Sequence, residues 1–104
     1  MNKEYIRELI DEANEIDAQN DVLMEENRKK RLEEMSKSEE ETIAYLNDCS
    51  EIELLWATEV LEELFEIFNS GKFVECIEKN TNRCENNDIK EQLKMTLAYI
   101  RCIK

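Results

Sequence analysis

The chain has 104 residues, of which 41% are hydrophobic and 38% charged, and its formal net charge is −12, from 26 acidic and 14 basic residues. This balance is too apolar for a disordered chain, and the lack of Pro together with a single Gly argues against a β-rich domain built on tight hairpin turns. Because the chain contains no His, it cannot form a His-based triad or the Glu-x-x-His pairs of di-iron bundles, and one Gly is too few for a phosphate-binding loop.

The first predicted element is an amphipathic helix from Asn2 to about Gln19, where apolar residues recur at helical spacing along one side. Asn20 or Asp21 can cap a second helix, but neither residue interrupts a continuous one. The sequence therefore leaves open whether residues 2–35 form one helix or two.

Residues 25–42 are highly polar, with Leu32 and Met35 as their only large apolar groups. Opposite charges four residues apart support a solvated helix here, so the segment is predicted to be an exposed helical arm or a frayed linker. It includes a basic cluster, residues 28–31, which acidic neighbours on both sides partly neutralise. We interpret the cluster as a lattice of surface charges. A short helix through residues 43–46 should follow.

The strongest element is a single core helix from Ser50 to Phe68, which opens on the capping box Ser50-Glu51-Ile52-Glu53. Asn69-Ser70-Gly71 should stop it, with Gly71 in the left-handed conformation. A short return helix over residues 73–77, a polar connection over residues 80–88 and a last helix to about Ile103 complete the chain. The apolar arc of this last helix exceeds half of its circumference.

These elements predict an all-α fold, a small helical bundle of about five to six helices, some of them short, in a single domain spanning residues 1–104. No apolar run reaches the 18 residues that a membrane-spanning helix needs, and acids occupy the N-terminus where a signal peptide needs a basic start, so we expect a cytoplasmic protein. The cysteines match no closely spaced metal-binding pattern and are expected to be reduced. Cys49, Cys76 and Cys102 are predicted to lie in the core and Cys84 to be exposed.

The negative charge repels phosphate backbones and anionic headgroups, so we expect no direct binding to nucleic acid or membranes, and a basic protein as partner. The candidate docking surface is the outer side of the core helix, where an acidic strip is bordered by apolar and aromatic residues. Such a surface suits a basic partner, because buried aromatic groups anchor while carboxylates steer. The alternative is that the N-terminal helices cover Trp56 and its apolar neighbours, so the sequence leaves open whether Trp56 belongs to the core or to an interface. The candidate residues are Ile52, Leu55, Trp56, Glu59, Glu62, Glu63 and Glu66.

The sequence therefore predicts a non-catalytic binding protein without cofactor or metal. We expect a stoichiometric inhibitor, of the immunity type or a phage anti-defence protein, that docks on a basic nuclease or toxin. The alternative is a structural helical oligomer or adaptor, in which the first helix pairs with a second copy as a homodimer. A minor alternative is an Mg²⁺-dependent all-α nucleotide pyrophosphohydrolase, since Glu62, Glu63 and Glu66, with Glu85 and Asp88, superficially resemble the acids that hold Mg²⁺ in those enzymes.

Overall fold

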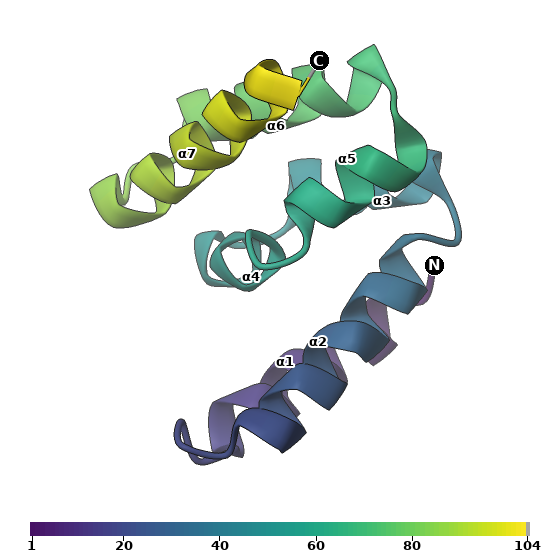
Figure 1. The fold of residues 1–104 in the computed structure, drawn as a ribbon, viewed down its shortest axis with the longest axis vertical. Helices are drawn as coiled ribbons and strands as arrows, with labels where there is room; N and C mark the ends of the chain where they lie inside the picture. The colour runs from purple at the N-terminus through teal and green to yellow at the C-terminus, as the bar shows by residue number, and fades with distance from the viewer. Residues whose placement is uncertain (104) are drawn as a thin grey trace.

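Helices make up most of the structure, a computed structural model that describes residues 1–103 (Figure 1). The all-α prediction is confirmed. Within the described residues there are seven helices, one or two more than the sequence predicted. They are α1 Lys3–Glu15, α2 Asp21–Met35, α3 Glu39–Asp48, α4 Glu51–Ala57, α5 Leu61–Phe68, α6 Gly71–Arg83 and α7 Asn87–Ile103. Residues 2–35 thus form two helices, separated at Ile16–Asn20.

The helices pack as neighbouring pairs around a shared interior (Figure 1). The α1–α2 hairpin occupies one end of the molecule and the α6–α7 pair the other. α3 packs on α6, while α4 and α5 both contact α7. α4 also contacts α1, and α5 contacts α2, so these two short helices join the N-terminal hairpin to the C-terminal pair.

All seven helices contribute side chains to one hydrophobic core cluster. Burying a Leu, Ile or Phe side chain stabilises the fold by about 1.5–3 kcal/mol, so this shared cluster is the main source of cohesion. Members exposed by 1% or less include Ile6, Tyr45, Leu46, Leu54, Val60, Leu61, Leu64, Phe73, Ile77, Leu93 and Ile100.

Side-chain caps fix where most of the helices begin. A Ser or Asn oxygen accepts a backbone N–H from the first turn, which satisfies one of the donors that a helix start leaves free. At α7 the cap is Asn86, which accepts the N–H groups of Asp88 and Ile89, so the helix starts at Asn87, within the polar connection predicted over residues 80–88. The other capping residues are Asn2, Asn20, Ser38, Ser50 and Ser70.

The predicted core helix over residues 50–68 is wrong in one respect, because it breaks between Ala57 and Leu61. In a continuous helix the Trp56 carbonyl would accept the N–H of Val60. Instead it accepts Nη1 of Arg31 from α2 at 2.9 Å and the backbone N–H of Glu59 at 3.3 Å, and the Val60 N–H donates to the Ala57 carbonyl at 2.9 Å. A tertiary hydrogen bond and a tighter turn of the backbone thus occupy the acceptor that helix continuation needs.

Arg31 is the centre of a buried polar network, with only 2% of the residue exposed. Its Nε donates to Oδ1 of Asn27 at 2.8 Å, its Nη2 donates to Glu59 at 2.7 Å, and its guanidinium lies 5.2 Å from the ring centroid of Trp56. Asn27 in turn donates to the Leu9 carbonyl at 2.8 Å. The network therefore ties α1, α2 and the end of α4 together.

This network corrects the interpretation of residues 25–42. The segment is neither an exposed arm nor a linker, because it holds most of α2, a short connection and the start of α3. Asn27, Met35 and Thr42 are buried within it, each exposed by 2% or less. Within the basic cluster, Arg31 is an interior residue rather than part of a surface lattice.

The end of α5 and the extent of α6 also differ from the prediction. Asn69 takes the left-handed conformation, with φ of 45°, and Gly71 instead begins α6. α6 continues to Arg83, whose Nη2 donates to the carbonyls of Leu46 at 2.9 Å and Cys49 at 3.0 Å. The first residues of the predicted polar connection therefore extend α6 and cap the end of α3.

Glu51 holds the connection between α6 and α7 against the start of α4. Its Oε1 accepts the backbone N–H groups of Glu85 at 2.7 Å and Asn86 at 3.0 Å. The hydrogen bond from Asn86 is the largest of several that hold the pKa of Glu51 below its usual range. Among residues 1–103, no helix combines the length and the apolar character required to cross a bilayer.

We predict that Arg31→Leu destabilises the fold by about 2–4 kcal/mol, since it leaves the buried Oδ1 of Asn27 without a donor and removes the hydrogen bond from α2 to the Trp56 carbonyl. Arg28→Leu is the matched control: Arg28 is one turn away and pairs with Glu25 and Glu63, all three at least partly exposed, so its loss should cost less than about 1 kcal/mol. Urea unfolding followed by circular dichroism measures both. Equal losses of stability in the two variants would contradict the conclusion that the Arg31 network holds α2 against α1 and α4.

Candidate functional site

The seven candidate residues lie on two helices and the turn between them rather than along one helix. Ile52 and Leu55 are on α4 and are 59% and 38% exposed. Trp56 is half-buried, packed against the core cluster and beneath Arg31. Trp56 is thus held mainly by the interior, and its two apolar neighbours remain at the surface.

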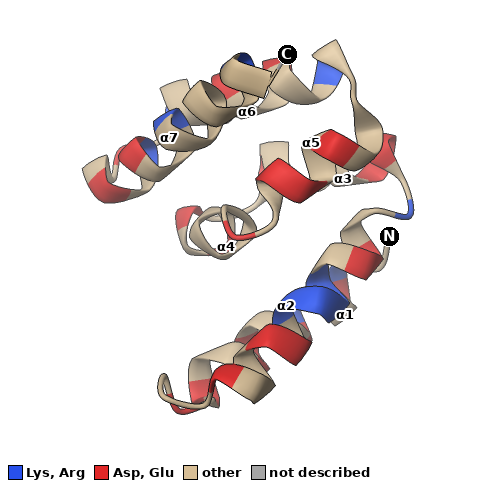
Figure 2. Cartoon of the chain, in the orientation of Figure 1, with Lys and Arg blue, Asp and Glu red and all other residues tan. Residues whose placement is uncertain are grey.

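The four candidate carboxylates divide into two classes. Glu59 pairs with Arg31 at 2.7 Å, and Glu63 pairs with Arg28. Within the described residues no cation pairs with Glu62 or Glu66. Figure 2 shows basic residues in the middle of α2 and acidic residues along α5. The sequence treated the four acids as equivalent, but the fold uses two of them to hold α2.

α7 adds residues to this surface that sequence reasoning did not include. Gln92 lines an open hollow of about 290 Å³ together with Leu55, Trp56, Thr58 and Glu59. Farther along α7, the Tyr99 hydroxyl donates to Glu66 at 3.1 Å. The hollow and this hydrogen bond place α7 beside both α4 and α5.

Met95 lies between Gln92 and Tyr99 on the same side of α7, because residues three and four apart share a helix face. Met95 is 64% exposed and Tyr99 39% exposed. The signal that could have identified them was the apolar arc of the last helix, which is wider than burial of one face requires. We define the α4–α5–α7 face by its members Ile52, Leu55, Glu59, Glu62, Glu66, Gln92, Met95 and Tyr99.

The electrostatics of this face are set by its unpaired carboxylates. The pKa of Tyr99 is raised, first by its hydrogen bond to Glu66, then by the negative charge of Glu66, by burial and by the charge of Glu62. The phenol therefore stays protonated and remains a donor. The face combines a polarizable thioether, an aromatic ring and carboxylates, a combination suited to contact with apolar and basic groups.

The acids of the hydrolase alternative do not converge. Among residues 1–103, no group of three or more Cys, Asp or Glu side chains is placed to hold a metal ion. Glu62, Glu63 and Glu66 are on α5, whereas Glu85 is held at the start of α4 through its backbone N–H.

The cysteines are arranged differently from the prediction in two positions. Cys49 and Cys76 are buried as expected, and burial raises the pKa of each thiol to about 11. Cys84, predicted to be exposed, is 4% exposed, and burial with the neighbouring Glu51 raises the pKa of its thiol to about 11. Cys102, predicted to lie in the core, is exposed.

Comparison of the chain with protein-family models, with curated proteins and with solved structures found no match. The functional argument therefore rests on the geometry of the α4–α5–α7 face.

We predict that one thiol of the native chain reacts rapidly with an aromatic disulfide reagent and that all four react in denaturant. The rapid thiol is Cys102, because the other three are buried and stay protonated near neutral pH. Cys102→Ser should remove the rapid phase, and the control Cys84→Ser should keep it. The reverse pattern would contradict the structure and restore the sequence prediction.

Proposed function

We propose that this protein is a stoichiometric binding protein that docks its α4–α5–α7 face on a basic protein. An inhibitor of the immunity or phage anti-defence type, directed at a nuclease or toxin, is the role that we favour. Proteins that handle nucleic acid carry clustered Lys and Arg to neutralise phosphates, and those clusters are the complement of an acidic face.

The observation that carries the proposal is the pairing of unneutralised carboxylates with exposed apolar side chains on one surface. Among residues 1–103 no cation pairs with Glu62 or Glu66, whereas Arg31 pairs with Glu59 and Arg28 with Glu63. Tyr99 is 39% exposed and its hydroxyl donates to Glu66 at 3.1 Å, while Leu55 on α4 and Met95 on α7 are also exposed. Interfaces typically concentrate their binding energy in a few apolar or aromatic anchors surrounded by polar groups, which is the arrangement found here.

The net charge of −12 supports the same role through its effect on association. A field of one sign attracts a partner of the opposite sign from a distance and raises the association rate, while contacts at the centre of the interface set the dissociation rate. The two kinds of residue on this face should therefore separate kinetically. Carboxylates should govern association and its salt dependence, and Met95 with Tyr99 should govern dissociation.

Self-association through the first helix, the alternative role, has no support from its packing. The apolar stripe of α1 is occupied within the chain: Ile6, Leu9 and Ile10 are exposed by 6% or less, and α1 packs on α2 and α4. The hydrolase alternative likewise lacks a converging set of acids among the described residues. We therefore propose the binding role alone.

We predict that the double variant Glu62→Lys, Glu66→Lys loses the basic partner that the tagged wild-type protein captures from its native host at low salt. The matched control is Glu8→Lys, Glu12→Lys, which makes the same charge change at exposed positions one turn apart on α1. With the captured partner purified, the surface variant should associate about tenfold more slowly or worse. The control should associate within about twofold of wild type.

Two outcomes would contradict the proposal. The first is equal capture by the surface variant and the control, because net charge alone would then explain retention. The second is recovery of only the protein itself at every salt concentration, which would favour the oligomer. Met95→Ala adds an independent measurement, since it should speed dissociation and leave the association rate nearly unchanged.

A further inference from the structure

α5 and α7 run side by side in the same direction (Figure 1). Gln92, in the first half of α7, lines the open hollow of the α4–α5–α7 face together with Glu59, which lies just before α5. Farther along, the Tyr99 hydroxyl donates to Glu66 of α5 at 3.1 Å. Both pairs are 33 residues apart in the chain, so the two helices advance in step.

α7 contributes a row of exposed apolar side chains to this line. Met95, Tyr99 and Ile103 recur every four residues and are 64%, 39% and 48% exposed. Residues four apart share one side of a helix, and eight residues span about 12 Å at 1.5 Å per residue. The row is therefore slightly longer than two turns of a helix.

α5 contributes a row of carboxylates along the same line. Glu62 and Glu66 are four residues apart, so their Cβ atoms lie about 5–6 Å apart on one side of α5. The shared register places Met95 level with Glu62, as Tyr99 is level with Glu66. Asp88, two turns before Met95 on α7, adds a carboxylate at the end of the apolar row. An acidic row and an apolar row thus lie next to each other.

The bases of α7 do not neutralise the acidic row. Lys94 pairs with Glu91 at 3.4 Å, and Arg101 pairs with Glu78 of α6 at 3.9 Å. Lys90 is turned about 140° away from the apolar row, because it lies five residues before the first member of that row. A basic partner therefore meets free carboxylates along α5.

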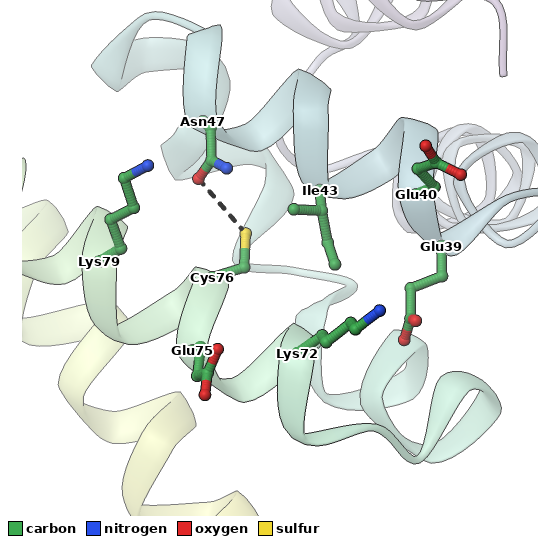
Figure 3. Close-up of a pocket in the computed structure, with 8 residues that line it drawn as sticks. All are labelled: Glu39, Glu40, Ile43, Asn47, Lys72, Glu75, Cys76 and Lys79. Atoms are coloured by element: carbon green, nitrogen blue, oxygen red, sulfur yellow. Dashed lines mark hydrogen bonds between the residues drawn. The ribbon is translucent and has the colours of Figure 1, made fainter.

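The open groove between α3 and α6, of about 820 Å³, lacks this separation of charges (Figure 3). Glu39 and Glu40 line it from α3, and α6 contributes Lys72, Glu75 and Lys79. Because base and acid alternate along α6, the groove does not select strongly for either sign of charge in a ligand. The two rows on α5 and α7 select a basic partner better than this groove does.

The two adjacent rows also select the secondary structure of what binds them. A helix can present two neighbouring rows of side chains on one side, each repeating every three to four residues. Lys or Arg residues four apart on such a helix have the same spacing as Glu62 and Glu66. A strand sends alternate side chains to opposite faces, so it offers one row per face rather than two.

We propose that the docking element of the basic partner is an α-helix of two to three turns that lies along α5 and α7. A row of Lys or Arg on this helix contacts Glu62 and Glu66. A neighbouring apolar row on the same side of the helix packs on Met95 and Tyr99. The proposal rests on the proposed function, since it names the segment of the partner that occupies the same face.

The experiment uses three peptides of equal Lys and Leu content, each about three turns long when helical. In the adjacent-row peptide the Lys row borders the Leu row, and in the opposite-row peptide the two rows lie on opposite sides. A hydrocarbon staple at the same positions keeps both helical, and circular dichroism confirms equal helicity. The third peptide has no staple and alternates Lys with Leu, as in a strand. Each is titrated into the isotopically labelled wild-type chain, with backbone amide shifts as the readout.

The adjacent-row peptide should bind at least about tenfold more tightly than either of the others, which corresponds to about 1.4 kcal/mol. It should shift the amides of Glu62, Glu66, Met95 and Tyr99. Because all three peptides carry the same charge, general attraction to an acidic chain contributes equally to each. Equal affinities of the two stapled peptides, equal or tighter binding of the alternating peptide, or shifts centred elsewhere would overturn the proposal.

Variants of the chain separate this proposal from the proposed function. Glu62→Lys, Glu66→Lys should weaken the adjacent-row peptide at least about tenfold, and the control Glu8→Lys, Glu12→Lys should leave its affinity within about twofold. Should the first variant fail to fold, the comparison of peptides on the wild-type chain still decides. No preference among the peptides, with capture of a basic partner intact, would reject the helix and leave the binding role. A clear preference without any captured partner would instead support the helix-binding surface and count against the role.

Discussion

One buried guanidinium positions much of this fold. Arg31 reaches from α2 into the space between the N-terminal hairpin and α4, and each of its three donor nitrogens has an acceptor: Asn27, the Trp56 carbonyl and Glu59. Taking a charge out of water is expensive, so the network persists only because every group in it is satisfied. The hydrogen bond to the Trp56 carbonyl lies in the last turn of α4, which ends at Ala57, and the chain restarts as α5 at Leu61. In a continuous helix, Leu55 and Glu59 would lie on the same helix as Glu62 and Glu66.

The network also decides which acids remain free. Arg28 and Arg31, both on α2, form ion pairs with Glu63 and Glu59. Fewer carboxylates of this acidic strip are therefore available to a partner than the sequence suggests. Glu62 and Glu66 are left beside the exposed side of α7. Acidic proteins gain solubility from charge anywhere on their surface, but a docking surface needs free charge beside apolar groups. Because Arg28 and Arg31 pair with Glu63 and Glu59, the carboxylates left without a cation are those on the α4–α5–α7 face, which also carries exposed apolar side chains.

Periodicity and capping signals identified the helices because both are local. Ser50 and the apolar spacing of α1 and α7 were sufficient to place the starts of those helices within a few residues. The break at residues 58–60 could not be found this way, since the local pattern fits a continuous helix and the competing donor comes from Arg31, distant in sequence. Cys84 was misplaced for the same reason: its neighbours in sequence are polar, but Glu51 and the start of α4 cover it.

The candidate surface was partly predictable. Leu55, Glu62 and Glu66 could be found from one helical wheel, because an exposed side of a helix is visible in its pattern. The division of the acids into paired and free ones, and the contribution of Met95 and Tyr99, depend on contacts between helices. For Met95 and Tyr99, the sequence offered one signal, because the apolar arc of α7 is wider than the burial of one side of a helix requires.

The most direct test of the account is amide hydrogen exchange of the chain, free and bound to the partner that it captures. The account predicts that protection increases at the end of α4, along α5 and on the Gln92–Tyr99 side of α7, while α1 is unchanged. Protection that appears on α1 or α2 instead, with α5 and α7 unchanged, would show that the partner binds elsewhere and would contradict the role assigned to this face.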